Sequence, residues 1–128
     1  MSYLLDTHAL LWWWLDQDDL SPIARAAIME RRGPVFVTPV SAIEIGIKVR
    51  TGKLPIMREP LERFDDLVRR DRFTHLPIDY IHARHAGVMP GVCRDPFDRM
   101  IAAQALIEGL TVITRDPAFA AFGCEVLW

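Results

Sequence analysis

The chain has 128 residues, of which 51% are hydrophobic and 25% are charged, with a formal net charge of −2. This length and balance predict one globular domain, residues 1–128, with enough apolar residues to form a core. The slight negative charge excludes a generally basic nucleic-acid-binding protein. The longest apolar stretch, Ala9 to Leu15, is too short to span a bilayer, so we expect no membrane association. Two cysteines are too few for a disulfide framework and indicate a cytoplasmic protein with reduced thiols.

Short apolar runs alternate with helical patterns through the first half of the chain. Ser21 and Pro22 are suited to cap and begin a helix, and Gly33 is suited to end it. Ser41 lies three residues before Glu44, which is the spacing of a helix capping box. The expected elements are a strand at 2–5, helices at 8–15 and 21–33, a strand at 35–37, and helices at 41–50 and 60–72.

The same alternation continues in the second half. Asp95 and Pro96 predict the start of a well-formed helix, and Gly109 predicts its end. The expected elements are a weak strand at 75–78, helices at 79–86 and 95–109, a strand at 111–114 and a short final strand at 124–127. Strands that alternate with helices predict an α/β protein with a parallel sheet covered by helices on both faces.

Acidic residues follow several of these apolar runs. Asp6 comes directly after the first strand, and Asp116 comes just after the strand at 111–114. Ligands of parallel sheets bind at the carboxyl ends of strands, where these residues fall. Gathered carboxylates repel one another unless a hard cation such as Mg²⁺ or Mn²⁺ lies between them. We therefore predict a metal-dependent enzyme acting on phosphate esters, with four acidic site residues: Asp6, Glu44, Asp98 and Asp116.

Each acid also has a structural explanation when it is taken alone. Glu44 could complete a capping box, and Asp95 could be the N-cap of its helix. Asp98 would be favoured by the helix dipole, and Asp116 is a natural turn residue. Asp6 is harder to explain, because an unpaired charge beside the interior of a sheet is costly. We prefer one shared site to several unrelated explanations.

The ordered set of motifs resembles the PIN-domain family, and within it the VapC-type toxins that pair with small antitoxins. The motifs that carry the resemblance are Asp6-Thr7-His8, Ser41-x-x-Glu44-Ile45, Arg94-Asp95-Pro96-Phe97-Asp98-Arg99 and Thr114-Arg115-Asp116. The resemblance runs from residue 3 to about residue 127. It implies a three-layer α/β/α sandwich and a toxin that acts as a Mg²⁺- or Mn²⁺-dependent endoribonuclease.

The resemblance also assigns roles to the acids. Asp6 and Asp98 would be the direct metal ligands, while Glu44 and Asp116 would act through waters, orient the nucleophile or bind a second ion. Relatives often carry His-His before the Arg-Asp-Pro-Phe-Asp run, whereas this chain has Val92-Cys93 there. That departure leaves the four acids in place, but the substrate preference of such relatives does not carry over to this chain.

Basic and hydroxyl side chains flank the acids and are candidate substrate contacts. Arg94, Arg99 and Arg115 could bind phosphates, since guanidinium groups match them in bidentate geometry. The alternative is a set of Arg–Asp ion pairs within the cluster. Thr7 and Thr114 could contact substrate or water, with helix capping the alternative for Thr7. The four histidines show no metal-ligand grouping, and His82 and His85 are expected on a solvated helix surface.

Three consecutive tryptophans, Trp12 to Trp14, lie in the first predicted helix. Successive helical residues point about 100° apart, so three large rings cannot all enter one core face. The resemblance implies that such toxins pair with themselves and bind an antitoxin, so we expect a homodimer in which one or more of these rings lie in the dimer or antitoxin contact. The alternative is a helix that is buried on most of its sides.

Three other functions remain to be weighed. A PIN nuclease of RNA processing without a toxin role would share every motif. A receiver-like signalling domain needs an acidic pair after the first strand and a lysine after the last clear strand, but the chain has Asp6-Thr7 and Thr114-Arg115 there. A non-catalytic binding module would leave the four gathered carboxylates unexplained.

Overall fold

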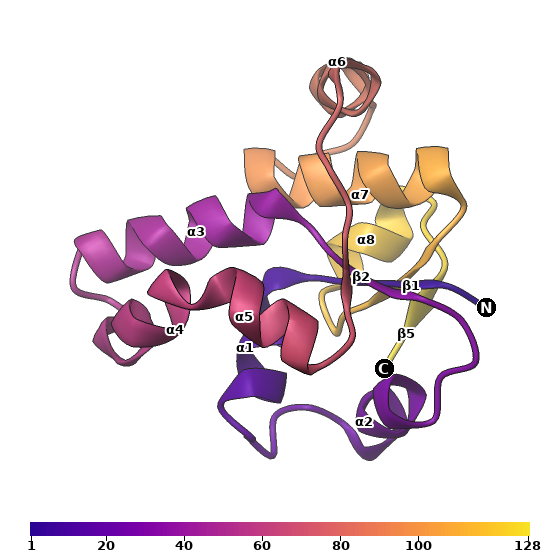
Figure 1. The fold of residues 1–128 in the computed structure, drawn as a ribbon. Coiled ribbons are helices and arrows are strands. Elements are labelled where there is room, and N and C mark those ends of the chain that lie inside the picture. The colour runs from indigo at the N-terminus through magenta and orange to yellow at the C-terminus, as the bar shows by residue number, and fades with distance from the viewer.

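Five short strands form one parallel sheet at the centre of the computed structural model, which describes residues 1–128 (Figure 1). The strands are β1 (Tyr3–Leu5), β2 (Val35–Val37), β3 (Thr74–His75), β4 (Thr111–Ile113) and β5 (Val126–Leu127). They lie in the order β3-β2-β1-β4-β5, and every neighbouring pair is parallel.

Eight α-helices and one short 3₁₀ helix connect the strands. The helices are α1 (Thr7–Trp14), α2 (Pro22–Met29), α3 (Pro39–Arg50), η1 (Pro55–Met57), α4 (Arg58–Glu62), α5 (Phe64–Arg70), α6 (Tyr80–Val88), α7 (Pro96–Glu108) and α8 (Pro117–Ala121). Figure 1 shows α7 and α6 stacked above the sheet and α2 below it. The predicted α/β/α sandwich with a parallel sheet is confirmed. None of the helices is both long and apolar enough to cross a membrane.

The two faces of the sheet bury different cores, because side chains alternate along a strand. Leu5 and Ile113 point to the face covered by α1 and α2, in one cluster of buried residues. Leu4 and Val112 point to the opposite face and pack with α7, where Ile101 is fully buried. Helices therefore cover the sheet on both faces.

Several helix boundaries differ from those predicted. The helix α3 begins at Pro39 with Thr38 as its N-cap, so Ser41 lies inside the helix. The helix α2 ends at Met29, and Gly33 does not cap it but lies against the backbone of Met1 at the approach to β2. A Cβ added at Gly33 would lie 2.4 Å from the Met1 carbonyl oxygen, so this glycine allows a close approach of two backbone segments.

The predicted helix at 60–72 is two helices, α4 and α5, which meet at Arg63. They contact different parts of the core, since Leu61 packs beside the cluster under α3 while Val68 is buried against the sheet. The short helix α8 was not predicted. Asp116 is its N-cap, and its Phe119 is completely buried.

His82 is buried, so the expectation of a solvated histidine pair on α6 is wrong for this residue. Its side chain is 2% exposed, because α6 packs on α7. The backbone N–H of Asp79 donates to Nδ1 at 2.9 Å, which leaves the proton on Nε2, 3.8 Å from Oε1 of Glu108. This histidine therefore joins two helices.

The three tryptophans of α1 are all half-buried, but they have different partners. The indole N–H groups of Trp13 and Trp14 both donate to Oδ2 of Asp71, at 3.1 and 3.0 Å. Trp12 lies on another side of the helix and contacts the ring of Trp128. Two of the three rings are thus hydrogen-bonded within the chain, and the third packs against another aromatic ring of the same chain.

Candidate functional site

The sheet has a switch point between β1 and β4, because the chain runs from β1 out to β3 and then returns to β4 on the other side of β1. Ligands of open parallel sheets bind in the crevice outside the carboxyl ends of such strands. Leu5 pairs with Ile113 in the register of the two strands, so the residues that follow them emerge side by side. Those residues are Asp6 and Thr114.

Asp6 is 5% exposed and lies at this crevice with both carboxylate oxygens bonded. Oδ1 accepts the backbone N–H of Ala9 at 2.7 Å, which makes Asp6 the N-cap of α1. Oδ2 accepts the hydroxyl of Thr114, and that hydroxyl oxygen accepts the backbone N–H of Asp116 at 3.0 Å. Burial raises the pKa of Asp6 even though these bonds favour its charged form.

Glu44 reaches the same region from α3. Its Oε1 accepts the hydroxyl of Thr7 at 2.7 Å, and that hydroxyl also lies 3.0 Å from the hydroxyl of Ser41. The capping-box explanation of Glu44 is therefore wrong, since Ser41 does not cap the helix. Thr7 does not cap a helix either, because Asp6 is the N-cap of α1.

Lys48 is the one basic side chain in an ion pair with these acids, and the sequence interpretation missed it. Its Nζ lies 3.9 Å from Oε2 of Glu44, one helical turn away along α3. The spacing of an acid four residues before a lysine on a helix could have revealed it. Asp6, Asp98 and Asp116 have no ion pair.

Asp98 lies in the first turn of α7 and is half-buried, with no hydrogen-bond donor on its carboxylate. Burial raises its pKa from 3.8 to about 7. The further causes are the negative charges of four carboxylates, in decreasing order Asp95, Asp116, Glu44 and Asp6. Burial and the charges of these carboxylates therefore act in the same direction on the pKa of Asp98.

Asp95 and Asp116 are the N-cap residues of α7 and α8. Asp95 is exposed, and its Oδ1 accepts the backbone N–H groups of Phe97 and Asp98 at 2.8 and 3.4 Å. Asp116 caps α8 through Ala118 at 2.9 Å. Helix N-termini carry partial positive charge, which offsets part of the repulsion among acids placed there.

The three arginines near the acids have different surroundings, and none forms an ion pair with the cluster. Arg99 donates to the backbone carbonyls of Ala86, Met89 and Cys93 and so secures the loop before α7. Arg115 lies over the ring of Trp12, with its carbon Cζ 4.4 Å from the centroid. Arg94 is exposed. The expected alternative of Arg–Asp pairs holding the acids together is absent from the structure.

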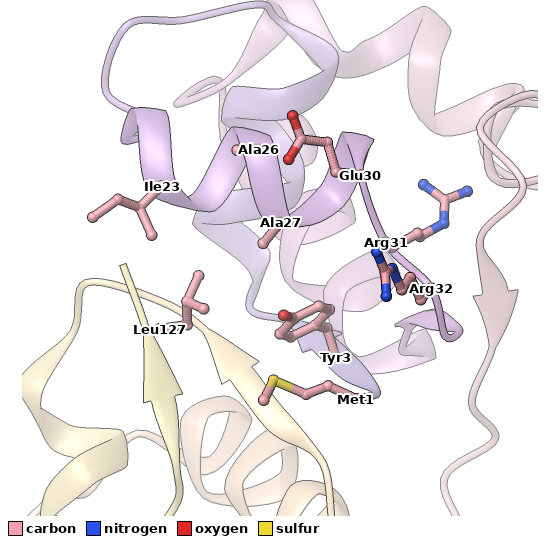
Figure 2. A pocket seen from close by; sticks show the side chains of 9 residues that line it. All are labelled: Met1, Tyr3, Ile23, Ala26, Ala27, Glu30, Arg31, Arg32 and Leu127. Atoms are coloured by element: carbon pink, nitrogen blue, oxygen red, sulfur yellow. The ribbon is translucent and has the colours of Figure 1, made fainter.

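Two hollows on the protein differ in their chemistry. The larger, about 410 Å³, lies between α2 and the sheet and is mostly apolar, with Tyr3 and Leu127 in its lining (Figure 2). Its one acid is Glu30. The second, about 340 Å³, includes both Asp6 and Asp116. Two of the four candidate acids, Asp6 and Asp116, therefore border the smaller hollow, while Glu44 and Asp98 line neither hollow.

The donor set suits Mg²⁺ or Mn²⁺, which prefer oxygen ligands. The carboxylates of Asp6, Asp98 and Asp116 have no cationic partner, and the mutual repulsion that Asp98 senses is what a cation would relieve. No three His, Cys, Asp or Glu side chains lie close enough together to enclose an ion. Mg²⁺ typically uses one or two carboxylates and keeps several waters, so two direct ligands with outer acids suit this arrangement.

Comparisons with known proteins agree with the fold. The chain is similar to VapBC2 from Rickettsia felis bound to a promoter DNA fragment, at 14% identity and a TM-score of 0.71, over 99% of this chain and 98% of that one. It is similar to FitAcB from Neisseria gonorrhoeae at 22% identity and 0.64, over 98% and 96%. It is also similar to a toxin–antitoxin complex from Klebsiella pneumoniae at 17% identity and 0.64, over 98% and 96%.

A comparison with curated protein sequences gives no significant match. The profile of the PIN-domain family matches residues 3–123, which is nearly the whole chain. This match covers the acidic residues at the carboxyl edge and the strands and helices that position them. The chain belongs to the PIN-domain family.

Proposed function

We propose that this protein is a Mg²⁺- or Mn²⁺-dependent endoribonuclease and the toxin of a toxin–antitoxin pair. The observation that carries the proposal is Asp98, a half-buried acid that senses four other carboxylates and has no donor of its own. Such unrelieved repulsion is costly for a fold and is typical of a site that binds a cation. Membership in the PIN-domain family, whose members are generally nucleases, supports the same reaction.

Asp6 and Asp98 are the proposed direct ligands, with Glu44 and Asp116 binding through water. The ion would supply Lewis-acid activation of water and would offset charge on the phosphate. The hydroxyl of Thr114 fixes one oxygen of Asp6, and the hydroxyl of Thr7 fixes one oxygen of Glu44. These two threonines are therefore positioning residues for the acids.

Arg94 and Arg115 are the proposed phosphate contacts. Both are exposed near the acids, and neither is bonded to the cluster, so their guanidinium groups are accessible to a strand. Arg99 was predicted to contact substrate, but its donors are bonded to backbone carbonyls. We assign it to shaping the loop from Met89 to Cys93.

RNA cleavage by purified, antitoxin-free protein tests the function. We expect total RNA to be cut in Mg²⁺ or Mn²⁺, and EDTA to abolish cutting. The matched variant is Asp6→Asn, which keeps the shape of the side chain and removes its charge. Cleavage that survives both EDTA and Asp6→Asn would contradict the metal assignment.

The proposed partners are RNA, a cognate antitoxin and a second copy of this chain, all in the cytoplasm. The similar structures from Rickettsia felis and Klebsiella pneumoniae are described as a VapBC complex and a toxin–antitoxin complex, which supports an antitoxin here. Large apolar side chains are exposed on α3 and α6, including Ile43 at 54% and Val88 at 77%, and such side chains suit a protein contact.

Light scattering on the free protein tests the homodimer, and we expect twice the mass of the single chain. Trp12 is the tryptophan of α1 most suited to an external contact, because Trp13 and Trp14 are bonded to Asp71. A monomer at all concentrations would exclude self-association as part of the function.

A further inference from the structure

The hollow beside Asp6 and Asp116 also contains aromatic and basic side chains. His8, Trp12 and Arg115 share its lining, and the space measures about 340 Å³. His8 is exposed, while Trp12 is half-buried. The proposed metal ligand Asp6 thus borders a space whose other side chains are suited to a different kind of contact.

These side chains form a stack. The guanidinium carbon of Arg115 lies 4.4 Å from the centroid of the Trp12 ring. His8, one helical turn before Trp12, has its ring centroid 5.5 Å from that of Trp12 at an interplanar angle of 34°. Trp128 meets Trp12 at 5.6 Å and 60°, an edge contact that steadies the indole. The cluster therefore holds Trp12 between partners, and its exposed members are His8 and Arg115.

Arg115 is the only lysine or arginine of this hollow, and it is free to respond to a ligand. Its one ion pair, with Asp19, has a separation of 4.0 Å, and both side chains are more than half exposed. Exposed pairs of this kind contribute little to stability. A phosphate could therefore replace Asp19 as the partner of Arg115.

We propose that His8, Trp12 and Arg115 form the subsite for the nucleobase next to the phosphate that is cut, an inference that rests on the proposed nuclease function. Nucleobases stack on aromatic rings and on guanidinium planes, and such stacking tolerates any base because every base has a flat face. A base can enter only when it is not stacked within a duplex. The new element is therefore a stacking position for one unpaired base beside Asp6 and Asp116.

Binding of short labelled oligonucleotides, measured by fluorescence anisotropy, tests the subsite without relying on cleavage. The probes are a single strand, the same strand with abasic positions at its centre, and the duplex. All are measured in Ca²⁺ in place of Mg²⁺, and again in EDTA to test whether binding depends on the cation. Trp12→Leu keeps the apolar packing but removes the ring. We expect it to weaken binding of the normal single strand by at least about fivefold and to leave the abasic strand unchanged.

Two further variants separate stacking from folding. Trp12→Phe keeps a ring and should retain most of the binding, whereas Arg115→Lys keeps the charge but loses the planar group and should weaken it. Trp13→Phe is the matched control on the same helix and should bind normally. If Trp12→Leu does not fold, photo-crosslinking of a 5-bromouracil strand to the wild-type protein gives a second measurement, with the crosslink expected at Trp12 or His8.

The outcomes distinguish this inference from the proposed function. Metal-dependent cleavage together with normal binding by folded Trp12→Leu overturns the subsite and leaves the nuclease intact. Binding that depends on Trp12 without metal-dependent cleavage overturns the nuclease and leaves a nucleobase-binding site that is not part of a cleavage site. Equal affinity of wild-type protein for normal and abasic strands, or crosslinks only to other residues, also overturns the subsite.

Discussion

Two partly buried carboxylates, Asp71 and Asp98, have opposite surroundings. Near the end of α1, the indoles of Trp13 and Trp14 both donate to Oδ2 of Asp71, and Arg70 pairs with the same carboxylate at 3.0 Å. In the first turn of α7, the carboxylate of Asp98 has no donor, and burial and the negative charges of other acids raise its pKa. One carboxylate is therefore stabilised by donors, and the other is repelled by acids.

The difference shows which charge serves stability and which serves function. A partly buried carboxylate with several donors stabilises the fold, because its desolvation is offset by charge-assisted hydrogen bonds. A partly buried carboxylate among other carboxylates is destabilising, and folds retain such groups at functional sites. Replacing Asp71 and Asp98 should accordingly have opposite effects.

The largest expected effect is the loss of activity in Asp98→Asn. Removing a proposed metal ligand should lower metal-dependent RNA cleavage by at least about a hundredfold, since a bound ion contributes several kcal/mol to such reactions. Asp71→Asn, tested at a temperature where it stays folded, should cleave at nearly the wild-type rate. Initial rates on one RNA substrate provide the measurement, and equal losses in both variants would break the contrast between Asp71 and Asp98.

The next effect is a loss of stability in Asp71→Ala. Two indole N–H groups and Arg70 lose their acceptor, which should lower the free energy of unfolding by about 2–4 kcal/mol. Urea unfolding followed by tryptophan fluorescence measures it. Asp66→Ala is the control on α5, because Asp66 is exposed and forms no hydrogen bond or ion pair, so its change should stay within about 0.5 kcal/mol.

The smallest effect is a gain of stability in Asp98→Asn when metal is absent. The folded-state pKa of Asp98 is raised from 3.8 to about 7, so the fold favours the protonated carboxyl. That contribution is complete below about pH 4 and is lost as the pH rises through 7. In EDTA, the stability of Asp98→Asn relative to wild type should therefore increase by about 1 kcal/mol between pH 5 and pH 8, a value reduced for solvent screening of a half-buried group.

Magnesium sharpens the same measurement. Because a cation relieves the repulsion that a proton otherwise relieves, Mg²⁺ should raise the unfolding midpoint of wild type more at pH 8 than at pH 5. The Asp98→Asn protein should respond less at both values. Asp66→Asn removes one charge away from the site and is the control. If the effect of Mg²⁺ is specific to the site, its unfolding midpoint should shift by as much as that of wild type. An Asp98→Asn protein that gains no stability at pH 8 would contradict the repulsion.

The candidate acids were identifiable from the sequence, because Asp6 and Asp116 follow apolar strands and Asp98 follows the Asp95-Pro96 helix start. Their helix contexts were partly misread. Glu44 could be predicted as an acid of interest, but its bond to Thr7 could not, since the two residues are 37 positions apart. Lys48 had a readable signal in its spacing from Glu44, whereas nothing in the sequence placed Trp12 against Arg115.

Local signals failed where two elements meet. His82 and His85 share a helix face that the sequence predicts to be solvated, yet α6 packs on α7 and buries His82. The 60–72 pattern is helical throughout, yet the chain changes direction at Arg63 because its two halves pack on different clusters. Tertiary packing decides such cases, since burial energies exceed the small preferences of single residues.

The sequence by itself determined the alternation of strands and helices, the start and end of α7 and the family, because these depend on periodicity, caps and motif order within short stretches. Only the tertiary structure decided that Thr114 donates to Asp6, that Asp98 senses four carboxylates, and that Asp71 is neutralised. Each of these depends on distances between residues far apart in the chain. Electrostatic and hydrogen-bond energies are set by those distances and by burial, which the order of residues does not contain.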